Sequence, residues 1–195
     1  CICNGGAVIY RNGNLLHAVS FSIEETRALL KTAGTVCGSD CEITVDTIDK
    51  IFWNRHKDKS TDYADNSIYD DFKNFVQPAM KICVQTDDPK KAKEIAQSVP
   101  DCDFLPFSDI PWYKFSPASA KKESAILILC QNLGISPQEI LAFGDDFNDI
   151  GMLKLCGKGI AMGNAIPQVK ATADDITKTN NEDGAAWYVE KEIFN

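Results

Sequence analysis

The sequence predicts an α/β protein built on a parallel sheet, and three observations lead to that prediction. Short apolar segments at 140–143 and 159–162 suit buried strands, and segments with helical periodicity alternate with them. An acidic loop, Gly-Asp-Asp-Phe-Asn-Asp at 144–149, leaves the first of these strands directly. The chain has 195 residues and is 44% hydrophobic, which is enough for the core of one sizeable domain or of two small ones.

The N-terminal half begins with a predicted hairpin followed by a helix. Two apolar segments within residues 7–19 flank an Asn-Gly pair, which favours a tight hairpin turn. Ser22 and Glu25 stand three residues apart ahead of an apolar series, which is the spacing of a capping box. We therefore expect a helix that starts after Ser22 and runs to about Ala33, ahead of the glycine that follows.

Periodicity and proline or glycine positions predict the remaining elements. Alternating apolar residues favour strands at 41–45, 51–53 and 80–85, with a polar, acidic stretch at 54–74. Pro89 suits the first turn of a helix that Pro100 closes, and an extended stretch follows. In the remainder we expect a helix at 121–133, a strand at 140–143, a helix at 149–156, a strand at 159–162, a short helix after residue 167, an edge strand at 176–177 and a helix at 184–193.

The charge and hydropathy of the chain disfavour two classes of partner, nucleic acids and membranes. With 28 acidic and 20 basic residues the net charge is −8, which disfavours a nucleic-acid backbone or an anionic membrane surface as partner. No apolar segment approaches the length of about 20 residues that a membrane-spanning helix needs, and no signal-peptide pattern opens the chain. We therefore expect a cytoplasmic protein without a nucleic-acid or membrane partner.

The eight cysteines do not form a recognisable metal or disulfide pattern. Their spacings lack the paired CxxC of a zinc site, and neither His17 nor His56 completes a ligand set. Cys83, Cys130 and Cys156 lie in apolar or helical patterns, where a free thiol behaves as a small hydrophobic residue. We expect structural thiols.

The acidic loop is itself a candidate metal site. Open α/β sheets bind their ligands beyond the carboxyl ends of the strands, which is where this loop starts. Several carboxylates so close together repel one another, and a hard divalent cation with oxygen ligands, usually Mg²⁺ beside phosphate, would offset that repulsion. The loop therefore indicates a magnesium site for phosphate chemistry.

Three motifs in the C-terminal half carry a resemblance to a known family. They are Gly144-Asp145-x-x-Asn148-Asp149, Gly159-Ile-Ala-Met-Gly163-Asn164-Ala165 and Asn181-Glu-Asp-Gly184. Together with the opening Asn4-Gly5-Gly6-Ala7-Val-Ile-Tyr, they resemble the haloacid dehalogenase (HAD)-like phosphatases, and more narrowly the Cof-like, type IIB capped subfamily. The resemblance implies a partial HAD-like Rossmannoid parallel core, residues 1–20 and 113–195, and an α/β cap for substrate selection, residues 21–112.

The resemblance also implies a reaction and the roles of individual residues. In this family an aspartate attacks phosphorus, and water then hydrolyses the aspartyl-phosphate. Asp145 matches the acid that binds Mg²⁺, and Asp149 matches a second acid, which takes part in metal binding and in catalysis. Asn148 would donate a hydrogen bond to the phosphate. Lys122 matches the lysine that binds the phosphate and offsets its charge, with Lys121 as the reserve candidate.

Each of these assignments has a simpler alternative. Aspartate and asparagine also favour turns and helix caps, so the loop could be a surface turn and Asp149 a helix N-cap. Lys122 could be a solvated lysine, because no neighbour in the sequence fixes its direction. Asn164 is better interpreted as a turn residue that supports the site than as a ligand.

The sequence departs from the family pattern where the nucleophile is expected. The family's Asp-x-Asp motif follows the first core strand, and the only such spacing here, Asp101-Cys102-Asp103, lacks a preceding apolar strand. We interpret that match as a coincidence. We therefore expect a truncated chain that lacks the nucleophilic aspartate and is inactive alone, and whose core sheet another chain could complete.

Two functions remain open from the sequence. In the first, the chain belongs to a Mg²⁺-dependent phosphohydrolase of small phosphorylated metabolites such as sugar phosphates, and supplies the metal ligand, the lysine and the cap. In the second, it is a non-catalytic remnant of that fold that binds a ligand or a partner.

Overall fold

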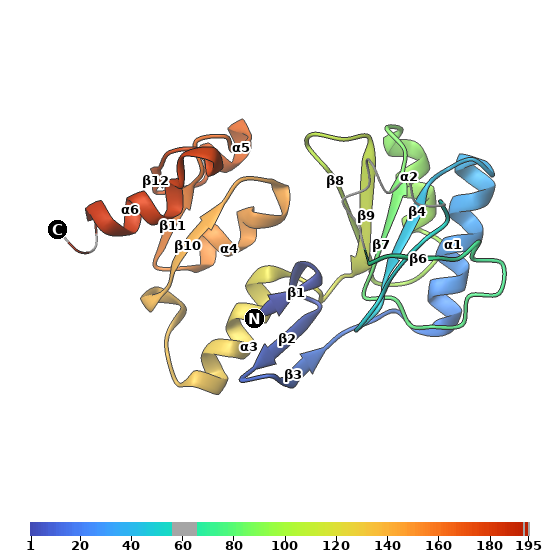
Figure 1. Cartoon of the computed structure of the whole chain (residues 1–195), viewed down its shortest axis with the longest axis horizontal. Coiled ribbons are helices and arrows are strands. Elements are labelled where there is room, and N and C mark those ends of the chain that lie inside the picture. The colour runs from blue at the N-terminus through green and yellow to red at the C-terminus, as the bar shows by residue number, and fades with distance from the viewer. Residues whose placement is uncertain (56–65, 193, 195) are drawn as a thin grey trace. The chain divides into compact units, whose positions relative to one another are not determined.

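The computed structural model describes residues 1–55, 66–192 and 194. The chain forms two compact units, residues 1–120 and residues 121–195. Both combine helices with strands, and the second contains a parallel sheet (Figure 1). The predicted α/β class is thus confirmed, whereas residues 56–65 of the polar stretch expected between the early strands lie outside the described residues.

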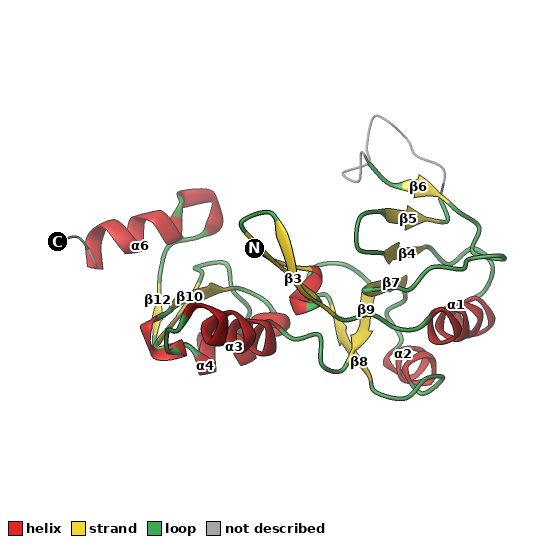
Figure 2. Ribbon diagram, turned by 90° about the horizontal axis from the view of Figure 1, so that it is seen from below, coloured by secondary structure: helices red, strands yellow, loops and turns green. Residues whose placement is uncertain are grey.

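The first unit is dominated by a six-stranded sheet with the strand order β6-β5-β4-β7-β9-β8. Neighbouring strands are antiparallel except β5 and β6, which are parallel. The strands are β4 (Ile43–Asp46), β5 (Ile51–Trp53), β6 (Ile68–Tyr69), β7 (Lys81–Gln85), β8 (Cys102–Pro106) and β9 (Trp112–Pro117). Helices α1 (Ile23–Cys37) and α2 (Pro89–Ala96) lie on one face of this sheet (Figure 2). Leu29 of α1 and Ile95 of α2 are fully buried there, in one core with Val45 and Ile82.

The capping box predicted at the start of α1 is present. The Glu25 N–H donates to Ser22 Oγ over 3.1 Å, and the Ser22 N–H donates to a Glu25 carboxylate oxygen over 2.8 Å. The helix continues through Gly34 to Cys37, beyond the predicted end. A single glycine costs a helix only about 1 kcal/mol, so it need not end one. The chain leaves the helix at Gly38, whose φ of 94° suits glycine.

The opening segment forms the predicted hairpin within a small antiparallel sheet. Its strands are β1 (Ile2–Cys3), β2 (Val8–Arg11) and β3 (Asn14–Ala18), in the order β1-β2-β3. Asn12 and Gly13, between β2 and β3, both have positive φ, of 50° and 80°. This is the requirement of a type I′ turn and explains why the Asn-Gly pair marks the hairpin.

The compact units divide the chain at residue 120, and the expected core of residues 1–20 and 113–195 with a cap of residues 21–112 stays a prediction. Strand β9 pairs with both β7 and β8, so the six-stranded sheet continues past the boundary expected at residue 112. The opening hairpin groups with this sheet rather than with the C-terminal part, because Val8 packs in one small core with Met80 and Ala120. The Phe21 N–H also donates to the Ala79 carbonyl over 2.9 Å. This hydrogen bond joins the segment that follows the hairpin to the segment that precedes β7.

The second unit is built around the parallel sheet β10-β11-β12. Its helices are α3 (Lys122–Leu133), α4 (Ile150–Leu155), α5 (Pro167–Lys170) and α6 (Gly184–Glu192), with short 3₁₀ turns η2 (Pro137–Glu139), η3 (Phe147–Asp149) and η4 (Asn180–Glu182). Its strands are β10 (Leu141–Gly144), β11 (Lys158–Ala161) and β12 (Asp175–Ile176). Every predicted element of this half is present within a residue or two of its expected position. Gly134, with a φ of 70°, ends α3 as predicted.

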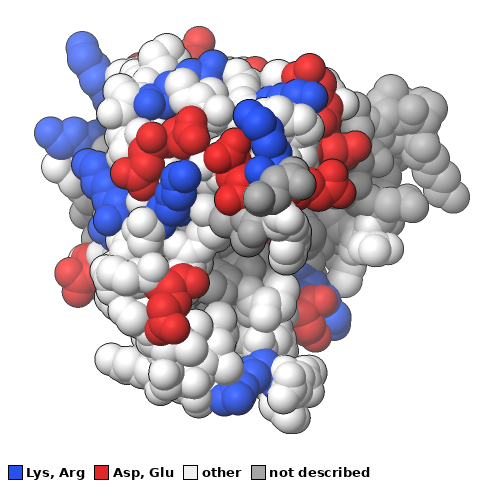
Figure 3. All heavy atoms as spheres, turned by 90° about the vertical axis from the view of Figure 1, so that its left-hand side faces the viewer, with Lys and Arg blue, Asp and Glu red and all other residues white. Residues whose placement is uncertain are grey.

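The described surface carries both signs of charge. On the face drawn in Figure 3, acidic and basic side chains are interspersed. None of the described helices combines the length and the apolar character that a membrane span requires.

Candidate metal and phosphate site

The candidate site lies at the carboxyl ends of β10 and β11 in the second unit. Two backbone hydrogen bonds join the loop after β10 to the turn after β11. The Met162 N–H donates to the Gly144 carbonyl over 2.9 Å, and the Ile166 N–H donates to the Asp145 carbonyl over 3.0 Å. The acidic loop therefore occupies the edge at which open α/β sheets bind ligands.

Asp149 holds the loop together from within. Its side chain is almost fully buried, at 6% exposure. Oδ2 accepts hydrogen bonds from the backbone N–H of Asp145, over 2.9 Å, and from that of Asp146, over 3.3 Å. Oδ1 forms an ion pair with the ammonium of Lys122. Three donors from two segments thus satisfy this buried carboxylate, as a charge in that position requires.

A glycine makes room for Asp149 at the end of β10. A Cβ at Gly144 would lie 2.9 Å from Asp149 Cγ and 3.1 Å from its Oδ2, and closer still to its Cβ. Ordinary contacts between carbon atoms are about 3.5–4.0 Å. Only glycine allows the strand and the aspartate to approach this closely, so the first residue of the loop motif has a steric function.

Lys122 is directed into the site from the first residue of α3. Its side chain is one-third exposed, at 33%, and its ammonium contacts the buried carboxylate of Asp149. The sequence could not fix the direction of this lysine, whereas the structure does. The assignment of Lys122 as the lysine that binds phosphate, with Lys121 as the reserve candidate, stays a prediction.

Asp145 presents its carboxylate at the exposed end of the loop. Oδ2 accepts a hydrogen bond from Asn164 Nδ2 over 3.3 Å. Partial burial raises the pKa of the Asp145 carboxyl above its ordinary value, and the negative charges of Asp149 and Asp146 raise it further. A cation bound beside Asp145 would relieve this repulsion, so the loop has the electrostatic character of a cation site.

The residues fit a magnesium ion in part. A carboxylate oxygen is a ligand that Mg²⁺ prefers, and Asp145 offers one. Asp149 is adjacent, but both its oxygens already accept hydrogen bonds, so its expected role as a direct ligand stays a prediction. Asn148 lies half-buried on η3, and its expected contact with phosphate is likewise a prediction. Among the described residues no three His, Cys, Asp or Glu side chains group to hold a metal, so Asp145 would be one ligand among others from outside this set.

The cysteines are free thiols. All eight are unpaired. Cys83, Cys130 and Cys156 are buried, which confirms the expectation that they act as small apolar core residues.

Two features of the site were not predicted from the sequence. The sequence does contain a signal for the steric function of Gly144, because a glycine at the end of a buried strand often marks a position where another part of the chain approaches the backbone closely. The contact between Asn164 and the backbone N–H of Asn180, over 2.9 Å, has none, since a backbone donor carries no residue type.

Known proteins resemble this chain over much more than the acidic loop. The sequence profile of the haloacid dehalogenase-like hydrolases matches residues 1–189. The chain is 49% identical over 65 residues to the 5-amino-6-(5-phospho-D-ribitylamino)uracil phosphatase of Bacillus subtilis, covering 33% of this chain and 26% of that protein. It is 39% identical over 90 residues to the HMP-PP phosphatase of Klebsiella pneumoniae, covering 46% of this chain and 33% of that protein. The alignments span only about a quarter to a third of these relatives.

Solved structures share the fold over almost the whole chain. One is a HAD subclass IIB sugar phosphatase, with a TM-score of 0.81, 21% identity, and coverage of 95% of this chain and 72% of that chain. Another is a haloacid dehalogenase-like hydrolase from B. subtilis, with a TM-score of 0.81, 22% identity, and coverage of 97% and 78%. At these identities the likeness is one of fold. With a family profile that matches nearly the whole sequence, these findings confirm the resemblance seen in the motifs: the chain belongs to the haloacid dehalogenase-like hydrolase family.

Proposed function

We propose that this chain is part of a Mg²⁺-dependent phosphohydrolase that acts on small phosphorylated metabolites such as sugar phosphates. One observation carries the proposal: the Lys122–Asp149 ion pair lies next to the carboxylate of Asp145, where a parallel strand ends. The names of the relatives support the class of substrate, because two of them are phosphatases of small phosphorylated compounds. A sugar phosphate is the substrate class named for one protein of the same fold.

Each residue has a role that its surroundings support. Lys122 provides a positive charge at the site that offsets the negative charge of a phosphate. Asp149 acts as the positioning residue for Lys122 and, through two backbone N–H groups, for the loop. Asp145 is the carboxylate ligand for Mg²⁺, and Asn148 donates a hydrogen bond to the phosphate. When bound, the metal polarises the phosphoryl group and neutralises developing charge.

The nucleophile is the part that this sequence does not provide. Asp101-Cys102-Asp103, its only Asp-x-Asp spacing, lies at the start of β8, an edge strand of the antiparallel part of the six-stranded sheet. That position differs from the end of a buried parallel strand, where the family's nucleophile is expected. We therefore propose that the attacking aspartate comes from outside these 195 residues, either from a longer form of the protein or from another chain that completes the core sheet.

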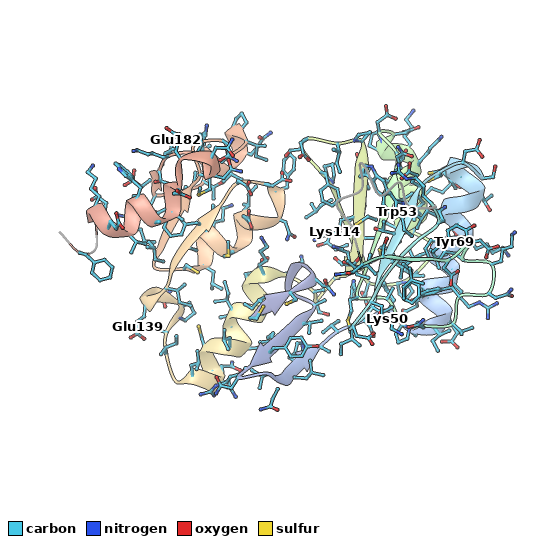
Figure 4. All side chains as sticks on the ribbon, in the orientation of Figure 1. Lys50, Trp53, Tyr69, Lys114, Glu139 and Glu182 are labelled. Atoms are coloured by element: carbon cyan, nitrogen blue, oxygen red, sulfur yellow. The ribbon has the colours of Figure 1, made fainter. Side chains whose placement is uncertain are left out.

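The six-stranded sheet with α1 and α2 is our candidate for the cap that selects the substrate. Because alternate residues of a strand point to opposite faces, Trp53 of β5 and Lys114 of β9 lie on the face opposite the two helices; both are labelled in Figure 4. Lys114 is buried, and the Arg55 guanidinium lies over the Trp53 ring at 4.5 Å from its centroid. An aromatic ring with cations on that face suits a polar metabolite with a negative group.

A second candidate function is a non-catalytic module that binds a phosphorylated ligand or a partner protein. The observation that favours it is the small number of clustered ligands, since the described residues hold no group of three metal-binding side chains. In that case Lys122 would bind phosphate without turnover.

Hydrolysis of an aryl phosphate in the presence of Mg²⁺ separates these functions. The assay uses the 195-residue chain and a longer form that includes any coding sequence upstream of Cys1, each with and without the substitution Asp145→Ala. We expect turnover only in the longer form, and at least a hundredfold loss on Asp145→Ala, of the order seen when a metal ligand or its partners are removed. Asp109→Ala, at an exposed position in the other unit, is the matched control and should retain full activity.

Equal activity of the Asp145→Ala and parent proteins would rule out the phosphohydrolase proposal. Binding of inorganic phosphate without turnover in either form would support the binding module instead.

A further inference from the structure

The turn after β11 contacts the candidate metal ligand through one side chain. Asn164 Nδ2 donates a hydrogen bond to Asp145 Oδ2 over 3.3 Å, and Asn164 Oδ1 accepts one from the backbone N–H of Asn180 over 2.9 Å. The side chain therefore bridges the acidic loop and the segment before α6.

The Asn180 N–H determines which way the Asn164 amide faces. Asn180 is the first residue of η4, and an N–H at the start of a helix has no partner within the helix. A backbone N–H can only donate, so the atom it contacts must be the amide oxygen, and the amide nitrogen must face Asp145. The orientation thus follows from the hydrogen-bond network rather than from a free choice between two flips.

The segment that supplies this N–H is itself held firmly. Glu182, labelled in Figure 4 at η4, accepts from the Thr179 hydroxyl over 2.6 Å and from the Thr179 N–H over 3.2 Å, which forms a capping box. The turn that carries Asn164 is equally constrained, because the Gly163 N–H donates to the Lys178 carbonyl over 2.9 Å. A Cβ at Gly163 would lie 2.8 Å from the Thr179 backbone nitrogen. Both ends of the bridge are therefore fixed by backbone contacts.

The bridge leaves the two oxygens of Asp145 unequal. Oδ2 accepts the hydrogen bond from Asn164, whereas no N–H of the described residues donates to Oδ1, and the carboxylate lies beside that of Asp149. A carboxylate with one oxygen held by a neutral donor keeps its charge and loses its rotation, which leaves the other oxygen oriented for a ligand.

We propose that Asn164 is a positioning residue for metal binding: it holds Oδ2 of Asp145 and thereby presents Oδ1 to the cation. The inference rests on the proposed function, because it takes Asp145 as the metal ligand. It assigns Asn164 no contact with substrate or metal. Its function is to hold the Asp145 carboxylate at a fixed position relative to η4.

Binding of Mn²⁺, measured by electron paramagnetic resonance titration on the longer form of the protein that supplies the remaining ligands and, in parallel, on the 195-residue chain, tests the inference without any need for turnover. Mn²⁺ prefers the same oxygen ligands as Mg²⁺. Removing an outer partner of a metal ligand weakens metal binding by about 10–100-fold, and we expect a loss of that size for Asn164→Ala. Asn164→Ser should show the same loss, and as a polar turn residue it provides a second, fold-compatible variant. Asn181→Ala, at an exposed neighbouring position, is the matched control and should bind as the parent does.

The outcomes distinguish this inference from the proposed function. If Asp145→Ala abolishes Mn²⁺ binding while both Asn164 variants bind as the parent does, the positioning role is wrong and the phosphohydrolase proposal stands. If Asp145→Ala binds Mn²⁺ as tightly as the parent, or if the parent binds none in either form, both are wrong. A lower melting temperature of the Asn164 variants with unchanged affinity of the folded protein would mean that the bridge serves stability alone, and would also overturn the inference.

Discussion

Gly144→Ala is the most direct test of the geometry of the acidic loop, because it adds one methyl group and removes no functional group. The new Cβ would lie 2.9 Å from Asp149 Cγ and 3.1 Å from Oδ2. Restoring a normal contact of about 3.5–4.0 Å moves Asp149 by roughly 1 Å. Overpacking of this kind costs about 1–3 kcal/mol of stability.

The same displacement affects the chemistry. The Asp145 and Asp146 N–H groups lie 2.9 and 3.3 Å from Asp149 Oδ2, so a shift of that size breaks the weaker bond and lengthens the stronger. Lys122 would then follow its partner or lose it. A misplacement of about 1 Å lowers catalytic efficiency by about 100-fold. We therefore expect Gly144→Ala to reduce kcat/KM by about two orders of magnitude in the form of the protein that hydrolyses an aryl phosphate.

Urea denaturation together with the phosphatase assay measures both effects. Gly34→Ala provides the control, because Gly34 lies in helix α1 with no atom within 4 Å of an added Cβ. That substitution should stabilise the protein by about 0.5–1 kcal/mol and leave kcat/KM unchanged. A Gly144→Ala protein with parental stability and activity would refute the assignment of a steric function to this glycine.

Two further predictions concern side chains whose surroundings are equally specific. Lys122→Met removes the partner of the buried Asp149 carboxylate and should lower the free energy of unfolding by about 2 kcal/mol, discounted for the one-third exposure of the lysine; stability equal to that of the parent in urea denaturation would contradict the ion pair. Burial raises the pKa of the Cys41 thiol to about 12, with a smaller contribution from Cys37, so it should stay protonated and be alkylated by iodoacetamide at pH 8 far more slowly than the exposed Cys1. Peptide mass spectrometry over a time course measures the two rates, and equal rates would show that the thiol is not protected.

Local sequence signals predicted most of the secondary structure because the physics behind them is local. The capping box of Ser22 and Glu25 needs only a spacing of three, and the type I′ turn at Asn12-Gly13 needs only two residues that tolerate positive φ. The acidic loop could be placed at the end of a strand for the same reason, since an apolar segment precedes it directly.

Features that depend on packing between distant segments could not be predicted in the same way. The extended stretch after Pro100 could not be assigned to a sheet, because the membership of β9 depends on its pairing with β7 and β8. The direction of Lys122 depends on Asp149, which lies 27 residues further along the chain. The bridge through Asn164 depends on the backbone N–H of Asn180, which every residue except proline has, so the sequence contains no signal for it.

The engagement of Asp149 by three donors means that folding and chemistry share one carboxylate in this unit. A substitution that disturbs Asp149 or Lys122 changes the integrity of the loop and the charge of the site together, so a fall in activity at either position reports two effects at once. Mutational surveys that seek a more stable protein should therefore find few acceptable changes here, and their gains should come from positions such as Gly34, where stability and function are separate.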